Sequence, residues 1–290
     1  MSESSRRSQF LVDTAWLAAR LQDPTLRIVD VRGVIRPPSD PPPWYLESRD
    51  QYAAAHIPGA VYVGWLTDLT QPDAPVKMTM ASPERFAALM GRLGIGDEHL
   101  VIAYDDDGNH LAARLWFMLN HYGHAAVRLL DGGYPRWVAE GRPVTGEGPG
   151  HAPARFTPRI QPGWRVTAEE VRRALGDPTV RLVDSRTPAQ FRGEITRGQR
   201  KGRIRGAVNV PIEQFWDGPH KAWRGEAELQ ALHEAAGVTP DSRVITYCNA
   251  GVSASVGLFA LKLLGHEASS NYAGSWYDWE RDPSHPIELG

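Results

Sequence analysis

The chain has 290 residues, a formal net charge of −2 at pH 7 and a single cysteine, Cys248. This length is enough for two domains that each bury a core, and the near-neutral charge gives no sign of a nucleic-acid-binding stripe or a basic membrane-surface helix. One cysteine excludes an intramolecular disulfide, and a cysteine-based metal site needs further thiols or a histidine cluster.

The first half of the chain alternates short apolar runs with helical patterns. Its N-terminal end lacks the apolar core of a signal peptide, and no apolar run approaches the ~20 residues of a membrane span, so we expect a soluble cytoplasmic protein without membrane partners. Apolar runs at residues 26–32 and 100–104 predict strands, and residues 111–122 predict a helix. Strands separated by helices are typical of a parallel sheet covered on both faces. The proline-rich residues 36–43 predict an irregular surface loop.

The second half repeats the first. Residues 26–32 match residues 180–186, and the strand at residues 100–104 matches residues 243–247. Three further pairs of segments match in the same order: 14–24 with 167–178, 56–61 with 203–208, and 130–137 with 272–279. Ordered matches indicate a tandem repeat of one domain. We therefore predict a domain at residues 1–145, a Gly- and Pro-rich linker at residues 146–163, and a second domain at residues 164–290.

Cys248 lies between the predicted strand at residues 243–247 and an apolar helix predicted over residues 254–264. Ligands of open α/β sheets bind beyond the carboxyl ends of the strands. The N–H groups of such a loop, together with the helix N-terminus, form an anion site and favour the thiolate form of a cysteine. Cys248 is therefore a candidate nucleophile, and the alternative is a buried structural cysteine.

The repeat places Asp105 where the second copy has Cys248. The first-copy loop, Asp105-Asp106-Asp107, is acidic and has no thiol, so we predict that the first domain is catalytically inert. Carboxylates suit hard cations, but this triplet lacks the spaced ligands of a known motif, and a solvated loop is the favoured interpretation. We predict no metal site.

Two copies, a first loop without a thiol, and Cys-x-x-Gly-Val-Ser opening a helix together resemble the two-domain rhodanese family of sulfurtransferases. The similarity covers nearly the whole chain and includes residues 56–60, residues 184–186, the cysteine loop and Gly274-Ser275-Trp276. The resemblance implies an α/β fold of two tandem rhodanese-like domains, each with a mostly parallel central sheet flanked by helices.

The family implies a two-step reaction in which the Cys248 thiolate takes a sulfane sulfur, becomes a persulfide, and passes the outer sulfur to a thiophilic acceptor. The N–H groups of the loop would hold the persulfide anion. Ser253 would either donate to the sulfur or cap the helix. Arg186 and Arg197 match basic positions of the family, but Arg32 repeats Arg186 in the inert copy, so Arg197 is the better candidate for binding a donor anion. The loop residues expected at the substrate are Asn249, Ala250, Gly251, Val252, Ser253 and Ala254.

The residues after the cysteine bear on the sulfur donor, which the family implies to be a small anion. Thiosulfate enzymes of the animal type carry basic residues there, whereas this chain has Asn249 and Ala250. Mercaptopyruvate enzymes carry Gly-Ser there and an arginine where this chain has Gln190. Neither pattern is complete; the C-terminal residues 286–290 favour thiosulfate, and 3-mercaptopyruvate is the alternative. The resemblance implies no cofactor, and an acceptor that is cyanide, a thiol or a thioredoxin-like protein.

Two other functions compete with this interpretation. Cys-x5-Arg phosphatases share the fold, but the sixth position after Cys248 is Ala254, so a phosphate would lack its bidentate arginine. A carrier that accepts a persulfide and hands it to one protein partner would use the same chemistry at Cys248. In the first domain, His56 is predicted to brace a turn, and Asp68 is a candidate polar partner of the site.

Overall fold

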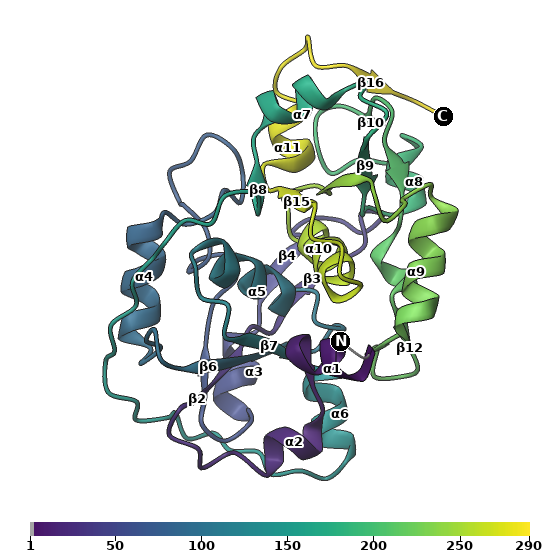
Figure 1. Ribbon diagram of the computed structural model, residues 1–290. Coiled ribbons are helices and arrows are strands. Elements are labelled where there is room, and N and C mark those ends of the chain that lie inside the picture. The colour runs from purple at the N-terminus through teal and green to yellow at the C-terminus, as the bar shows by residue number, and fades with distance from the viewer. Residues whose placement is uncertain (1–2) are drawn as a thin grey trace.

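Each half of the chain forms a five-stranded parallel sheet with helices on both faces (Figure 1). The computed structural model describes residues 3–290. The first sheet has the order β1-β7-β6-β2-β5, and the second has the order β11-β9-β14-β15-β8. The predicted α/β fold with two tandem domains is therefore confirmed.

The first sheet and its helices come from the N-terminal half of the chain. The strands of the sheet are β1 (Leu11–Val12), β2 (Leu26–Asp30), β5 (Ala60–Tyr62), β6 (Leu100–Tyr104) and β7 (Val127–Leu130). The helices are α1 (Glu3–Phe10), α2 (Thr14–Ala18), α3 (Arg49–Ala54), α4 (Pro83–Arg92), α5 (Ala112–His121) and α6 (Gly133–Ala139). A separate antiparallel hairpin joins β3 (Gly33–Ile35) to β4 (Tyr45–Glu47).

The second sheet repeats this arrangement. Its strands are β8 (Arg165–Val166), β9 (Val180–Asp184), β11 (Val208–Asn209), β14 (Arg243–Tyr247) and β15 (Ser269–Tyr272). The helices are α7 (Ala168–Ala174), α8 (Pro188–Phe191), η1 (Ile212–Gln214), α9 (Glu226–Ala235), α10 (Ser253–Leu263) and α11 (Ser275–Trp279). The second half also contains two short antiparallel pairs of strands. One pairs β12 (Trp216–Asp217) with β13 (Ala222–Trp223), and the other pairs β10 (Arg203–Ile204) with β16 (Ile287–Glu288).

The registers of the central strands show that the two halves are copies. Asp30 pairs with Tyr104 between β2 and β6, and Asp184 pairs with Tyr247 between β9 and β14. The sequence predicted the helices after β6 and β14 to within a residue or two at each end, because their apolar runs are long. The central strands β6 and β14 therefore end at equivalent places, and the two loops of interest follow them.

The two domains share one interface, formed where α5 and α10 lie side by side (Figure 1). Both helices are buried along nearly their whole length, and one cluster of buried apolar residues contains members of both domains. Trp116 of α5 packs edge-to-face on Phe259 of α10 with 4.9 Å between the ring centroids, and Phe10 of α1 packs on the same phenylalanine. Because these helices start at the two loops, their packing also brings the loops together.

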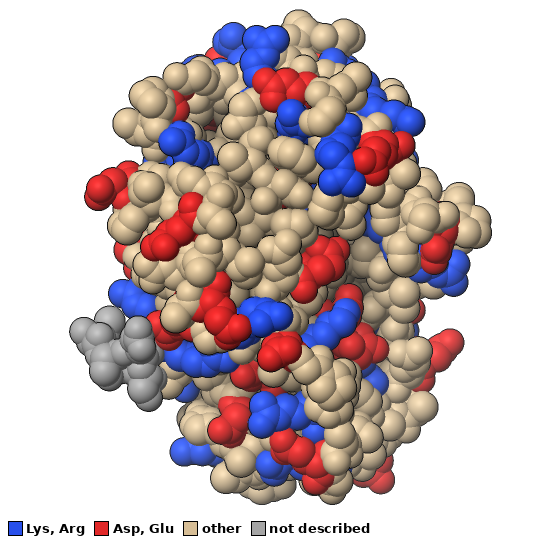
Figure 2. Space-filling view, turned by 90° about the vertical axis from the view of Figure 1, so that its right-hand side faces the viewer, with Lys and Arg blue, Asp and Glu red and all other residues tan. Residues whose placement is uncertain are grey.

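The connecting segment and the surface agree with the sequence in most respects. His56 pairs with Thr145 through the backbone, and its ring contacts the carbonyls of Tyr52 and Glu147, so the predicted bracing role is confirmed. Among the described residues, no helix is long and apolar enough to cross a membrane. Basic and acidic side chains are interspersed over the face in Figure 2, and neither sign covers that face alone.

Candidate active site

Cys248 follows β14 at the centre of the second sheet, and α11 holds the start of its loop. The Cys248 N–H donates to the hydroxyl of Ser275 at 3.0 Å, and the Cys248 carbonyl accepts from the N–H of Trp276 at 3.0 Å. The carbonyl of Asn249 accepts from the N–H of Tyr277. These bonds explain the Gly-Ser-Trp motif. In a planar trans peptide the N–H group points away from the carbonyl of the preceding residue. Because the carbonyls of Cys248 and Asn249 point toward α11, the N–H groups of Asn249 and Ala250 point away from α11, toward the interior of the loop.

The N–H groups of the cysteine loop are unpaired within the protein. None of the N–H groups of residues 249 to 254 donates a hydrogen bond to another group of residues 3–290. Gly251 makes the turn with φ of +75°, and a Cβ there would lie 2.6 Å from the carbonyl oxygen of Ala273, so only glycine fits. Unpaired N–H groups that converge in a loop before a helix form an anion site.

In the first domain, the N–H groups of the equivalent loop bind the side chain of Asp105. One carboxylate oxygen of Asp105 accepts from the N–H groups of Asp107 and Asn109 at 2.9 and 2.8 Å. The other accepts from Leu111 and Ala112 at 2.6 and 2.9 Å. The carboxylate that replaces the thiol thus occupies the first loop itself. The positions equivalent to these four donors in the second loop are Ala250, Val252, Ala254 and Ser255.

This finding corrects the expectation of a solvated acidic loop. Asp105 is fully buried, and burial raises its pKa although the N–H groups of Ala112, Asp107 and Leu111 act against that effect. Asp107 is paired with His110 and Lys221. The prediction of a solvated loop failed because the spacing of the three aspartates in the sequence does not show that the N–H groups of the loop fold around the Asp105 carboxylate. Within residues 3–290, no cluster of three acidic, histidine or cysteine side chains could hold a metal ion.

A cavity of about 370 Å³ lies over the cysteine loop, between the two domains. Asn249 and Ser253 form part of its wall, whereas Cys248 is only 2% exposed and lies beneath them. The rest of the second-domain wall comes from Ser185, Arg186, Thr187, Gln190, Arg197, Ile212, Glu213, Trp216 and Lys221, and the first domain contributes Ile35, Arg36, Pro37, Pro38, Asp107 and His110. The site is therefore an interface site, as predicted.

The first-domain insertion forms part of this wall. The sequence predicted residues 36–43 to be a surface loop, but the segment joins the two strands of the β3–β4 hairpin, and its first residues line the cavity. Tyr45 of β4 contacts Tyr277 of α11 with 2.9 Å between the hydroxyl oxygens. The expectation of an irregular surface loop is therefore confirmed, but composition did not show that its first residues line the cavity.

Ser253 meets His110 across the domain interface. The Nε2 atom of His110 lies 2.8 Å from the Ser253 hydroxyl, and its Nδ1 atom lies 3.5 Å from Asp107. The hydroxyl makes no cap bond to the N-terminus of α10. Burial raises the pKa of Asp107, but the bonds and charges of His110 and Lys221 outweigh it and lower that pKa overall. The Ser253 side chain is thus held by the first domain instead of capping α10, and its donation to the sulfur stays a prediction.

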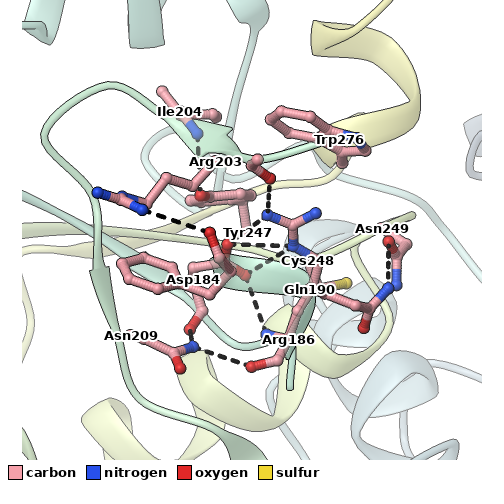
Figure 3. Close-up of polar contacts among 12 residues, drawn as sticks. Asp184, Arg186, Gln190, Arg203, Ile204, Asn209, Tyr247, Cys248, Asn249 and Trp276 are labelled. Carbon is pink, nitrogen blue, oxygen red and sulfur yellow. Dashed lines mark hydrogen bonds and ion pairs between the residues drawn. The ribbon is translucent and has the colours of Figure 1, made fainter. Parts of the chain in front are cut away.

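Arg186 is paired with the buried carboxylate of Asp184. Its Nε atom donates to both carboxylate oxygens at 2.9 and 3.1 Å, Nη2 donates at 2.6 Å, and the two side chains are about 1% and 0% exposed (Figure 3). In the inert domain, Arg32 donates to Asp30 in the same way. This duplication supports a structural role, although Arg186 also lines the cavity.

Arg197 faces the cavity without a carboxylate partner among the described residues. Its guanidinium donates to the carbonyl of Arg36 and, at 3.3 Å, to the hydroxyl of Tyr45, both in the first domain. Its Nε atom is buried and has no partner. By contrast, the charges of Arg186 and Lys221 are neutralised by Asp184 and Asp107. Arg197 therefore retains an uncompensated positive charge in the cavity wall.

The remaining candidates divide between the site and the surface. The Gln190 amide donates to the Asn249 side chain at 3.2 Å, which closes one side of the cavity beside the cysteine loop (Figure 3). Ala250, Val252 and Ala254 take part through their backbone. Asp68 accepts from the N–H of Gly64 and pairs with Arg49, away from the cavity, so the suggestion that it serves the site is wrong.

Three residues at the site escaped the sequence analysis. Ser275 belongs to the Gly274-Ser275-Trp276 motif, and the sequence alone gave no role for this serine. His110 aligns with Ser253 in the repeat, a relation that was available from the sequence but carries meaning only once the two helices are docked. Arg114 is a charged residue inside the apolar run of α5, and its guanidinium donates to the carbonyl of Gly251 at 3.3 Å.

Comparison with known proteins identifies the family. The sequence profile described as "Rhodanese-like domain" matches residues 13–140 and 167–282. The chain is 34% identical to the sulfur carrier protein TtuD of Thermus thermophilus and 32% identical to a thiosulfate sulfurtransferase of Azotobacter vinelandii, covering 97% of each relative. Its structure superposes on SseA of Escherichia coli, described as a 3-mercaptopyruvate sulfotransferase, with a TM-score of 0.83 and 29% identity over 92% of this chain and 98% of SseA. With its two matching domains, a thiol in one loop and a carboxylate in the other, the chain belongs to the rhodanese family.

Proposed function

We propose that this protein is a sulfurtransferase that moves the sulfane sulfur of thiosulfate to a thiophilic acceptor through a persulfide at Cys248. The thiolate attacks the outer sulfur of thiosulfate and forms a new S–S bond with it. The S–S bond of thiosulfate breaks, and sulfite leaves with the electron pair of that bond. Cyanide then attacks the outer sulfur of the persulfide, so thiocyanate leaves and the thiolate returns. No net oxidant or reductant is needed.

The observation that carries this proposal is the set of unpaired N–H groups around Cys248. The equivalent groups of the inert loop hold the carboxylate of Asp105 with four bonds. Hydrogen bonds to an anion are roughly twice as strong as those between neutral groups. The loop of Cys248 supplies three of the four equivalent donors, the N–H groups of Ala250, Val252 and Ala254, whereas the N–H of Ser255 donates to the carbonyl of Val252. The three free donors can stabilise both the thiolate and the persulfide, the anions on the two sides of the first step.

The cavity fits a small anionic donor. Two of its lining arginines, Arg36 and Arg197, have no carboxylate partner within residues 3–290, and its volume of about 370 Å³ suits a molecule of a few heavy atoms with water. Gln190 and Ala250 provide neither a guanidinium nor a hydroxyl, which favours thiosulfate over 3-mercaptopyruvate. The proposal also includes an acceptor of the thiol or thioredoxin-like class and a cytoplasmic location. It divides the chain into an inert domain (1–145), a linker (146–163) and a catalytic domain (164–290).

The similarity to TtuD, which bears the name of a sulfur carrier, favours a second candidate function. In that case Cys248 would be loaded once and unloaded only by a protein partner. Steady-state assays with thiosulfate and cyanide, and with 3-mercaptopyruvate and a thiol, separate the candidates. We expect many turnovers, with a higher kcat/KM for thiosulfate. A single equivalent of bound sulfur without turnover would support the carrier, and neither loading nor turnover would refute the proposal.

Replacing Arg197 should weaken donor binding. A hydrogen bond to a charged group contributes about 1.5–3 kcal/mol, so Arg197→Ala should raise the KM for thiosulfate roughly tenfold to a hundredfold with a smaller change in kcat. Arg192→Ala is the matched control, because Arg192 is an exposed arginine of the same segment that pairs with Glu194. Equal KM values for the two variants in steady-state kinetics would show that Arg197 does not bind the donor.

A further inference from the structure

Arg114 of the inert domain is a buried cation beneath the cysteine loop. The residue is 2% exposed, and its guanidinium donates only to two carbonyls, those of Gly251 and Met78, each at 3.3 Å. No carboxylate of residues 3–290 lies within ion-pair distance of it. Burial of a charge without a counter-charge is strongly unfavourable. The position therefore calls for an anion that the resting contacts do not include.

Cys248 is the candidate for that anion, because it lies in the loop whose Gly251 carbonyl accepts from Arg114. Burial lowers the pKa of Arg114 to about 10, and the negative charge of Cys248 is the largest influence that opposes this. Tyr122 is the other acid that faces Arg114, but burial raises the pKa of this phenol, and its hydroxyl donates to the carbonyl of Ala81. Tyr122 is thus neutral at pH 7. The third charged group that acts on Arg114 is Arg165, a cation that lowers its pKa further. Of these three groups, only Cys248 can offer a negative charge near neutral pH.

Arg114 also orients the loop. The carbonyl of Gly251 accepts from Arg114, from the Ser255 hydroxyl at 2.7 Å and from the Asn271 amide at 3.1 Å. With that carbonyl fixed by three donors, the N–H of Val252 in the same planar peptide points the opposite way. A Cβ on Gly251 would lie only 3.0 Å from Nη1 of Arg114, so the guanidinium packs directly against the loop.

The repeat shows that this cation is specific to one copy. The position equivalent to Arg114 in the catalytic domain is Gly257, where a Cβ would lie 2.8 Å from the hydroxyl oxygen of Ser185. The copy that carries the thiol therefore has no room for a cation in its own helix. The copy that lacks the thiol carries the cation on α5, which packs against α10.

We propose that Arg114 is a positioning residue, contributed by the inert domain, that stabilises the negative charge of Cys248 and fixes the cysteine loop through Gly251. The inference rests on the proposed role of Cys248 as the nucleophile. Arg186 and the phenol of Tyr277 also interact electrostatically with Cys248, but Asp184 neutralises the charge of Arg186. Arg114 has no such carboxylate partner within residues 3–290.

The test is the rate of Cys248 alkylation by iodoacetamide as a function of pH. Arg114→Gln keeps an N–H donor for Gly251 but removes the charge, so we expect the midpoint of the profile to rise by about one pH unit and the rate at pH 7 to fall about tenfold. Arg114→Lys should restore the midpoint. Arg128→Gln, which changes a half-buried arginine of the same domain, is the control and should match the wild type.

A folded Arg114→Gln protein with the wild-type midpoint would overturn the inference. Alkylation needs no sulfur donor, so the result is independent of the proposed reaction. A shifted midpoint in a protein that takes up no sulfur would refute the sulfurtransferase function and leave the role of Arg114 intact.

Arg114→Lys keeps the inference testable even where Arg114→Gln does not fold. Lysine retains the positive charge, so a folded Arg114→Lys protein should show the wild-type alkylation profile. A folded Arg114→Lys protein whose Cys248 reacts at pH 7 much more slowly than that of the Arg128→Gln control would contradict a role for the charge.

Discussion

Cys248→Ser should abolish sulfur transfer and leave the protein folded. A serine hydroxyl does not ionise near neutral pH and cannot form a persulfide, so the covalent step is lost rather than slowed. The bonds that hold this position are made by the backbone, from the Cys248 N–H to Ser275 and from the N–H of Trp276 to the Cys248 carbonyl, and they do not involve sulfur. Thiocyanate production from thiosulfate and cyanide measures the loss, and circular dichroism checks the fold.

The matched control for this substitution is Ser270→Ala. Ser270 lies on the adjacent strand β15 and is also buried, but its hydroxyl donates to the carbonyl of Gly163 and not to the cysteine loop. This variant should keep most of its activity. Turnover of thiosulfate by the Cys248→Ser protein above the rate without protein would rule out a persulfide mechanism at this residue.

Arg186→Met should cost the protein much of its stability. The change leaves the carboxylate of Asp184, which is 0% exposed, without its partner. Burial lowers the pKa of Arg186, but the charge and hydrogen bonds of Asp184 outweigh burial and raise that pKa above its usual value, so the pair is favourable in place. Removing one partner of a buried pair typically costs about 3–5 kcal/mol. The corresponding fall in Tm is roughly 6–20 °C for a chain of this size.

Arg32→Met is the control that separates stability from activity. Arg32 pairs with Asp30 in the inert domain through the same kind of contact, so its loss should lower the Tm by a similar amount without reaching the cysteine loop. We expect the two variants to transfer sulfur at similar rates per folded molecule. A loss of rate confined to Arg186→Met would show that this guanidinium contacts the donor as well as Asp184.

The fold could be predicted from the sequence because it depends on local patterns. Buried parallel strands appear as apolar runs, and the repeat let each strand and helix be assigned in two copies. Cys248 could be singled out as the candidate nucleophile because it follows the central strand β14 and precedes an apolar helix. The free N–H groups of its loop could be expected as well, since the first N–H groups of a helix have no partner within the helix.

The contacts between the domains could not be predicted in this way. His110 and Arg114 reach the cysteine loop only because α5 packs against α10, and the sequence of either helix does not show how the two dock. The same limit applies to residues 36–38, which line the cavity from an insertion that looks like a solvent loop. Asp105 was misjudged for a related reason, since its partners are N–H groups of its own loop and the sequence does not reveal loop closure.

The first domain thus contributes several contacts to the site. It supplies His110 beside Ser253, Arg114 beneath Gly251, and the groups that hold Arg197 in place. The contacts of His110 and Arg114 depend on the packing of α5 against α10.

The central claim is that Cys248 carries the transferred sulfur. Intact-protein mass spectrometry after incubation with thiosulfate, and again after cyanide, tests it directly. We predict that the wild-type protein gains the mass of one sulfur atom, that peptide mapping places the sulfur on Cys248, and that cyanide removes it. A protein that gains no sulfur, or a Cys248→Ser protein that gains as much as the wild type, would contradict the account.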